Sequence, residues 1–166
     1  MKKALIAAIL TLGIIASIGY VSYANRPVPP PPVSHVYTPE ELLVEANKLR
    51  AEKGVAPLKL DAKLNESAQW KAQDMADRDY FDHKDPSSGI VNGIGHYWSL
   101  KTGKCRYVSE NLEEQRDKSP FSPFARWANS PPHYSAIIDP DNTYTGFGIV
   151  NDSGRVLYVQ HFCKPY

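Results

Sequence analysis

Residues 145–163 read TGFGIVNDSGRVLYVQHFC, a sequence typical of two β-strands joined by a tight turn. The runs Thr145–Val150 and Arg155–Cys163 have the composition of strands, and residues 151–154 supply the Asn, Asp, Ser and Gly of a turn. Successive side chains of a strand point to opposite faces of the sheet. In the second run one face therefore carries Val156, Tyr158, Gln160 and Phe162, and the other carries Leu157, Val159, His161 and Cys163. The stretch predicts a C-terminal β-hairpin.

A first helix is predicted to begin after Thr38, at the other end of this region. Thr38 can cap the helix, Pro39 suits its first turn, and Glu41 stands at the third helical position of a capping box. Gly54 ends the helix near residues 50–53. Its apolar face, at helical spacing, consists of Leu42, Leu43, Ala46 and Leu49.

A second helix follows the connector at residues 56–58. Asp61 provides its cap, and the helix is predicted to end around Arg78–Phe81. The 3.6-residue period is kept by Leu64, Ala68, Ala72, Met75 and Ala76.

The central part of the chain is less regular. Residues 85–89 form a turn cluster, and the mixed stretch 90–103 is expected to be irregular. Arg106–Asn111 predicts a short strand, and Pro123–Asn129 predicts a third helix that the prolines of residues 130–132 interrupt. Since two or three helices precede a terminal hairpin, an antiparallel sheet covered by helices is the economical architecture.

The N-terminal segment is expected to carry the chain across a membrane. Lys2 and Lys3 precede Ala4–Ala24, a stretch of 21 residues without a charge. Its length favours an uncleaved membrane anchor, because a helix of about 20 apolar residues spans a bilayer. Its end, Ser22-Tyr23-Ala24, has the small residues that a signal peptidase requires. Both interpretations place the rest of the chain outside the cytoplasm.

A proline-rich segment follows. Residues 26–33 contain five prolines, which favour a stiff polyproline II spacer, with a ligand for proline-recognition domains as the alternative. The predicted organisation is therefore an anchor or signal peptide at residues 1–24, a linker at 25–37 and a domain at 38–166.

The composition excludes several classes of protein. With 42% hydrophobic residues, the chain matches a globular domain and not a collagen-like or disordered chain. Its 19 basic and 18 acidic side chains nearly balance, so it has no electrostatic footprint for nucleic acid. Cys105 and Cys163 are its two cysteines. In an oxidising compartment they are expected to pair, although two unrelated buried thiols would fit the sequence too.

Common catalytic motifs are absent from the sequence. It has no His-Glu-x-x-His, no Cys-x-x-Cys, no phosphate-binding glycine loop and no Gly-x-Ser-x-Gly. Among its histidines, His35 is expected to be solvated, His96 to lie in a loop and His161 to be a hydrogen-bonded structural residue. His83, Glu110 and His133 occur at spacings that by themselves indicate loop histidines and a solvated glutamate.

Three short motifs change this interpretation: Tyr80-Phe81-Asp82-His83, Ser109-Glu110-Asn111-Leu112 and Trp127-Ala128-Asn129-Ser130-Pro131-Pro132-His133. They occur in this order and are followed by Ile137-Ile138-Asp139-Pro140 and Gly146-Phe147-Gly148. From about Thr38 to Tyr166 the chain resembles the CAP superfamily of cysteine-rich secretory, venom-allergen and plant pathogenesis-related proteins, in its bacterial SCP-like branch. The resemblance implies an α+β fold, a three-layer α-β-α sandwich with a mainly antiparallel central sheet.

The resemblance also implies a functional cleft. His83, Glu110 and His133 match the cleft residues of the family, in which some members bind a divalent cation. Two imidazoles and a carboxylate suit zinc. This chain departs from the family pattern because residues 128–130 lack a second acid, Ser109 replaces a glycine, and Pro132 precedes the second histidine.

Two functions are compatible with such a cleft. The first is an extracytoplasmic binding module that holds a lipid, glycan or protein ligand at the cell envelope. The alternative is a metal-assisted hydrolase with Glu110 or His83 as general base. No serine or cysteine lies in a recognisable nucleophile motif, which favours binding.

Overall fold

The computed structural model describes residues 35–91, 104–116, 122–152 and 154–166, all within the compact unit Pro32–Tyr166. The predicted segment at 1–24, most of the predicted linker and His96 lie outside these residues. In chain order the elements are α1 (Pro39–Glu52), β1 (Lys59–Leu60), α2 (Ala62–Asp77), β2 (Cys105–Arg116), α4 (Pro123–Ala128), α5 (Pro131–Ile138), β3 (Tyr144–Asp152) and β4 (Arg155–Pro165).

The four strands form one sheet in the order β1-β3-β4-β2. The predicted hairpin is confirmed, since β3 and β4 pair antiparallel, and β2 adds to the other side of β4, also antiparallel. The sheet is mixed because β1 pairs with β3 in parallel. A strand of two residues leaves no alternating pattern, so β1 is not visible in the sequence.

One predicted boundary was wrong. The expected strand Arg106–Asn111 is part of the longer β2, because residues up to Arg116 pair with β4 although their sequence, Glu-Glu-Gln-Arg, is polar. The predicted end of the third helix is confirmed, since α4 ends at Ala128, before the prolines. The prolines then begin a further helix, α5, which was not predicted; proline fits the first turn of a helix, where its missing N–H is not needed.

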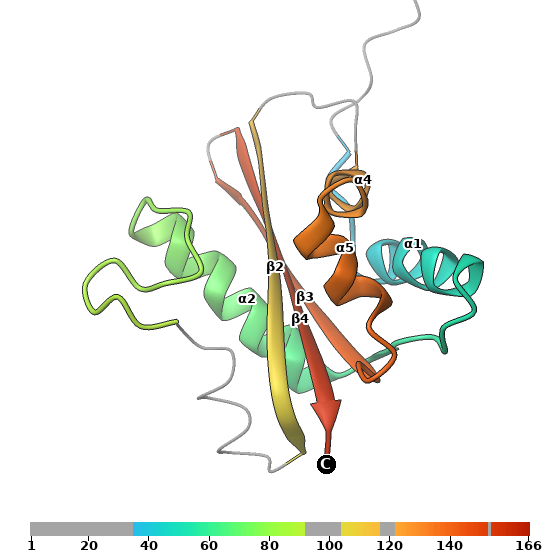
Figure 1. Cartoon of the computed structure of the whole chain (residues 1–166). Helices are drawn as coiled ribbons and strands as arrows, with labels where there is room; N and C mark the ends of the chain where they lie inside the picture. The colour runs from blue at the N-terminus through green and yellow to red at the C-terminus, as the bar shows by residue number, and fades with distance from the viewer. Residues whose placement is uncertain (1–34, 92–103, 117–121, 153) are drawn as a thin grey trace, which may run out of the picture. The chain divides into compact units, whose positions relative to one another are not determined.

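Helices cover both faces of the sheet, as the three-layer fold requires (Figure 1). On one face, a cluster of buried residues joins α1, α4 and α5 to the sheet and includes Leu42, Ala46, Phe124, Trp127, Ile137, Phe147, Tyr158 and Phe162. On the other face, α2 packs on the sheet through Ala68, Ala72, Met75, Leu112, Leu157 and Val159. Alternate residues of β4 thus enter two different cores, as their spacing predicts.

Two glycines of β3 bring α2 unusually close to the sheet. A Cβ atom added at Gly146 or Gly148 would lie 2.2 Å from the backbone of Leu64 or Ala68 in α2. Any larger side chain would therefore push the helix away. The close approach places the polar residues of α2, Ser67 and Lys71, directly over the strands.

A buried arginine holds the end of α5. The guanidinium of Arg50 in α1 donates to the carbonyls of Ile137 and Asp139 at 2.7 and 2.9 Å, and also to Ala56 and Asn142. Four carbonyl acceptors satisfy a charge that would otherwise be costly to bury. The contact fixes the short helix that carries His133.

The predicted disulfide is confirmed. Cys105 and Cys163 are bonded and join the beginning of β2 to the end of β4. The bridge spans 58 residues and, in the chain-entropy model, stabilises the fold by about 4 kcal/mol.

Among the helices of the described residues, none has the length and apolar character needed to cross a membrane.

Candidate functional site

The centre of the site is a cross-strand pair in the sheet. Glu110 of β2 lies directly opposite His161 of β4. The His161 Nε2 atom is 3.0 Å from Glu110 Oε2, and the two side chains are 0% and 2% exposed. A carboxylate can only accept a hydrogen bond, so His161 donates from Nε2. The pair faces α2, on the side of the sheet that carries Leu112 and Val159.

α2 supplies the partner for the other nitrogen of His161. Ser67 Oγ lies 2.9 Å from His161 Nδ1. In a neutral imidazole that donates from Nε2, Nδ1 is the acceptor, and the Ser67 hydroxyl then donates to it. The close packing of α2 on the glycines of β3 makes this contact possible. Both ring nitrogens of His161 are thereby held.

His83 reaches the same carboxylate from the loop after α2. Its Nδ1 atom is 2.6 Å from Glu110 Oε1, so both oxygens of Glu110 accept from an imidazole. The His83 side chain is 47% exposed. With Nδ1 committed to Glu110, Nε2 is the nitrogen that this half-exposed ring offers to a ligand. A carboxylate that fixes the tautomer and orientation of a histidine is a frequent partner of metal-binding imidazoles.

The charges of the site favour an ionised carboxylate. Burial by itself raises the pKa of Glu110, but the hydrogen bonds from His161 and His83 outweigh it and hold that pKa below its ordinary value. The same hydrogen bond to Glu110 raises the pKa of His83, against the opposing effect of burial. His83 therefore keeps its proton to a higher pH than a free histidine.

His133 lies on the neighbouring helix α5. Asn111, the residue after Glu110, donates from Nδ2 to the His133 backbone carbonyl at 3.2 Å, which places α5 beside β2. Burial, and then the positive charge of His83, lower the pKa of His133. The charge of His83 thus disfavours a second charge on His133, which is the more readily deprotonated of the two.

The possible metal ligands predicted from the sequence are His83, Glu110 and His133. Within the part of the chain that the structure describes, no group of three His, Cys, Asp or Glu side chains is placed to hold a metal ion. Both oxygens of Glu110 accept hydrogen bonds from histidines. Of the three predicted ligands, His83 and His133 are therefore the two that can offer a ring nitrogen to an ion. At residues 128–130, which lack a second acid, Asn129 donates from its side chain to the Ala125 carbonyl at the end of α4.

Three residues around the site were not assigned to it from the sequence. His161 was expected to be a hydrogen-bonded structural residue, and it is buried and hydrogen-bonded, but its partner is Glu110. Its position on the apolar face of β4 was a signal, because a buried polar group requires a partner. Ser67 and Lys71 stand among the buried apolar residues of α2, at positions where a polar side chain is equally unusual. His35, as expected, is exposed, and it pairs with Glu41.

The sequence matches the family model of CAP, the cysteine-rich secretory protein family, over residues 43–162. The chain therefore belongs to the CAP family. A curated relative, the uncharacterized protein YkwD of Bacillus subtilis (strain 168), is 34% identical over 132 residues, covering 79% of this chain and 49% of YkwD. The chain thus spans about half the length of this relative.

Solved structures share the fold. The match to an extracellular SCP-domain protein of Bacillus anthracis covers 76% of this chain and 40% of that protein, at 22% identity and a TM-score of 0.59. The match to an outer surface protein of Borrelia burgdorferi covers 76% and 92%, at 20% identity and a TM-score of 0.63. The match to NaASP2, crystallised with Zn²⁺, covers 74% and 77%, at 12% identity and a TM-score of 0.51. At these identities the likeness establishes the fold alone.

Proposed function

We propose that the chain is an extracytoplasmic CAP-domain protein that binds a ligand or partner at the cell envelope through the site at His83 and His133. One observation carries the proposal. Glu110, itself held by His161, fixes the half-exposed ring of His83 through Nδ1 and leaves Nε2 for a ligand. A buried carboxylate shared by two histidines is more than the fold needs, since an apolar pair would fill the same space.

We propose further that this site takes a divalent cation, zinc in particular. His83 Nε2 and His133 would bind the ion, and Glu110 would act on it through His83, which it orients. Such an ion would supply a Lewis acid with open positions for an oxygen atom of a ligand. The structure of NaASP2 with Zn²⁺ supports this choice of metal.

The location outside the cytoplasm has three supports. The uncharged segment after Lys2 and Lys3 predicts delivery across a membrane. The disulfide between Cys105 and Cys163 suits an oxidising compartment. Two proteins of the same fold are described as an extracellular protein and an outer surface protein. The expected ligands are accordingly lipids, glycans or proteins of the envelope.

Binding is favoured over hydrolysis by the state of Glu110. A general base must reach the proton that it removes. Glu110 is 2% exposed, and both of its oxygens already accept hydrogen bonds from histidines. This leaves it poorly placed to activate a water molecule at the site.

Zinc titration calorimetry of the full-length chain tests the proposal. We expect saturable binding of one zinc ion, and its loss in the double variant His83→Ala/His133→Ala. His35→Ala is the matched control, because His35 is an exposed histidine bound to Glu41 in α1. Zinc binding that is absent from the wild type, or undiminished in the double variant, would refute the cation site.

A further inference from the structure

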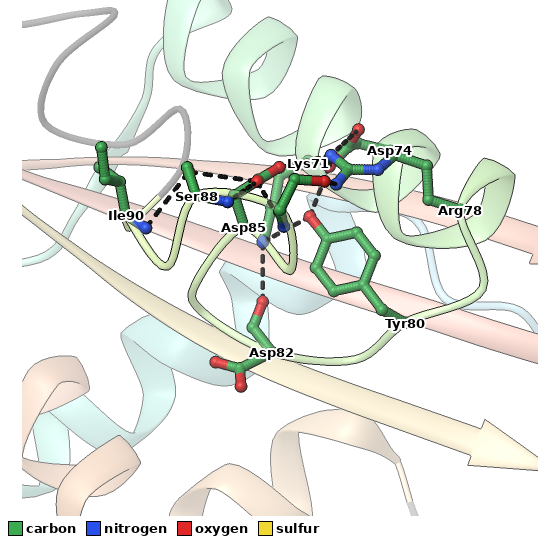
Figure 2. Close-up of polar contacts among 9 residues, drawn as sticks. Lys71, Asp74, Arg78, Tyr80, Asp82, Asp85, Ser88 and Ile90 are labelled. Atoms are coloured by element: carbon green, nitrogen blue, oxygen red, sulfur yellow. Dashed lines mark hydrogen bonds and ion pairs between the residues drawn. The ribbon is translucent and has the colours of Figure 1, made fainter.

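A buried lysine lies beneath the loop that carries His83. Lys71 of α2 is 0% exposed, and its Nζ atom donates to the Asp82 carbonyl at 2.7 Å and to Tyr80 Oη at 3.0 Å (Figure 2). The same Nζ atom lies 4.7 Å from the centroid of the Tyr80 ring. Burying an ammonium group is costly unless several partners compensate, so its position calls for an explanation.

The contact with Asp82 has a direct consequence for the site. Asp82 is the residue immediately before His83, so Lys71 ties the backbone next to His83 to the middle of α2. On the same helix, Ser67 lies one turn earlier and holds His161. One helix thus fixes both histidines that donate to Glu110.

Tyr80 strengthens this tie. Its backbone N–H donates to the Met75 carbonyl, which ends α2 and turns the chain back over the helix. Its hydroxyl donates to Asp74 while it accepts from Lys71, and its ring packs against the core beneath α2. Lys71, Tyr80 and Asp74 therefore form a connected chain of polar contacts (Figure 2).

The far side of the loop has a second polar attachment. Arg78 binds Asp85 at 2.5 Å, and Asp85 Oδ1 accepts from the backbone N–H groups of Ser87 and Ser88, both at 2.8 Å. Apart from Tyr80, the large apolar residues of this part of the chain contribute little core, since Phe81, Ile90 and Val91 are exposed. The position of the loop thus depends on these polar contacts more than on apolar packing.

Lys71 also interacts electrostatically with the carboxylate of the site. Burial lowers the pKa of Lys71, and the negative charge of Glu110 opposes this effect. Lys71 in turn contributes to holding the pKa of Glu110 below its ordinary value, after the hydrogen bonds from His161 and His83. The ammonium group thus binds the carbonyl of the residue before His83, and its charge favours the ionised acid to which His83 donates.

We propose that Lys71 is a positioning residue, which docks residues 79–90 on α2 so that His83 meets Glu110. Lys71 itself contacts no ligand. The proposal rests on the proposed function only for its zinc readout, because the docking of the loop can be measured without any metal.

The variant Lys71→Met tests it, since methionine keeps most of the stem and removes the charge and the donors. In the full-length chain we expect amide hydrogen exchange to become at least tenfold faster in residues 79–90 and to stay unchanged in β3 and β4. Lys63→Met is the matched control, an exposed lysine of the same helix that pairs with Glu66. Unchanged exchange in residues 79–90 would overturn the proposal.

A spectroscopic readout separates positioning from general stability. In an imidazole ¹H–¹⁵N correlation spectrum, assigned with His83→Ala, we expect the His83 Nδ1–H signal to lose the shift of a proton bonded to a carboxylate in Lys71→Met. If Lys71→Met does not fold, the same spectrum is recorded on Tyr80→Phe, in which we expect the same change of the His83 signal. This variant removes the hydroxyl that links Lys71 to Asp74 and keeps the ring. A wild-type signal in the folded variant would contradict the proposal.

The zinc readout completes the test. Zinc affinity should fall about tenfold or more in Lys71→Met, as for the loss of other residues that orient a metal-binding histidine. Absence of zinc binding in the wild type would refute the proposed cation site. The positioning role of Lys71 would then be tested by the hydrogen-exchange and imidazole measurements alone. Full zinc affinity in Lys71→Met would overturn the positioning role.

Discussion

Glu110 and His161 occupy opposite positions on the paired strands β2 and β4, and His161 donates to the carboxylate across the ladder at 3.0 Å. The pair is buried beneath α2, whereas His83, the other partner of Glu110, is half-exposed. The candidate site is therefore anchored in the sheet itself, and its outer histidine faces solvent. A change at Glu110 should affect stability and binding together.

Glu110→Gln is expected to weaken both. Glutamine presents one acceptor and one amide group, so one of the two imidazole N–H groups loses its partner, and the buried charge that holds them is gone. The free energy of unfolding should fall by about 2 kcal/mol, and zinc affinity should fall roughly 10–100-fold. Chemical denaturation and zinc calorimetry measure the two effects. Wild-type zinc affinity would show that Glu110 does not orient His83.

The contribution of His83 to stability should depend on pH. Its pKa is raised above the ordinary value of 6.5, chiefly by the hydrogen bond to Glu110. A histidine whose pKa is raised in the folded state stabilises the folded protein, and this contribution is complete at pH values below its pKa in the unfolded chain. The contribution is lost as the pH rises through its pKa in the folded state. The stability difference between wild type and His83→Gln should thus be largest below about pH 6.5 and shrink at higher pH.

Urea denaturation of both proteins from acid to mildly alkaline pH measures this difference. The control is the same pair in the Glu110→Gln background, where the cause of the raised pKa is removed and the pH dependence should disappear. A difference that is constant with pH would contradict the assigned role of the hydrogen bond.

Glu113 should destabilise the protein above neutral pH. Burial raises its pKa to about 7 from 4.5, and the charge of Arg126 only partly opposes this. Arg126 Nε lies 3.0 Å from Glu113 Oε1, but that oxygen makes no hydrogen bond to the described residues. Since the folded-state pKa is raised, the stability that comes from the protonated form is lost as pH rises through about 7.

Glu113→Gln should therefore stabilise the protein at pH 8, on the order of 1–2 kcal/mol, and have little effect at pH 5. Thermal denaturation at the two pH values provides the measurement. Glu114→Gln is the control on the same strand; Glu114 pairs with Arg116 and Arg155, so its loss should not stabilise. A Glu113→Gln protein that is less stable than wild type at pH 8 would show that the ion pair with Arg126 outweighs burial.

Gly148→Ala is expected to disturb the site from a distance. Its Cβ would lie 2.2 Å from the Ala68 backbone, so α2 must shift away from the sheet. We expect a loss of about 1–3 kcal/mol in stability, as for other overpacked positions. Zinc affinity should fall too, since α2 carries Ser67 and Lys71. Calorimetry with and without zinc measures both; wild-type stability would mean that the helix accommodates the methyl group.

Local patterns predicted much of the fold because their causes are local. The capping box at Thr38 and the cap at Asp61 begin α1 and α2 as expected, since each cap binds backbone N–H groups within three residues. The alternation in β4 assigned residues to the two cores correctly. The strand β1 and the polar end of β2 were missed, because only pairing with β3 and β4 makes these residues strands.

The residues of the site also fall into two groups, those that sequence motifs indicate and those that only tertiary contacts reveal. The order of three motifs singled out His83, Glu110 and His133 as candidate site residues, and the structure places His83 in contact with Glu110. The involvement of the other residues depends on contacts that are distant in the chain. Ser67 and His161 are 94 positions apart, and His161 and Glu110 are 51 positions apart. Lys71 and Asp82 are 11 positions apart. No spacing in the sequence encodes such contacts.

By itself, the sequence determined the first two helices with their caps, the third helix, the C-terminal hairpin, the two cysteines and the family motifs, because these depend on near neighbours or on composition. Only the tertiary structure decided that Glu110 is shared by two histidines and that a buried lysine holds the loop of one of them. The physical reason is the close packing of α2 on Gly146 and Gly148, which brings Ser67 over His161 and Lys71 beneath the His83 loop.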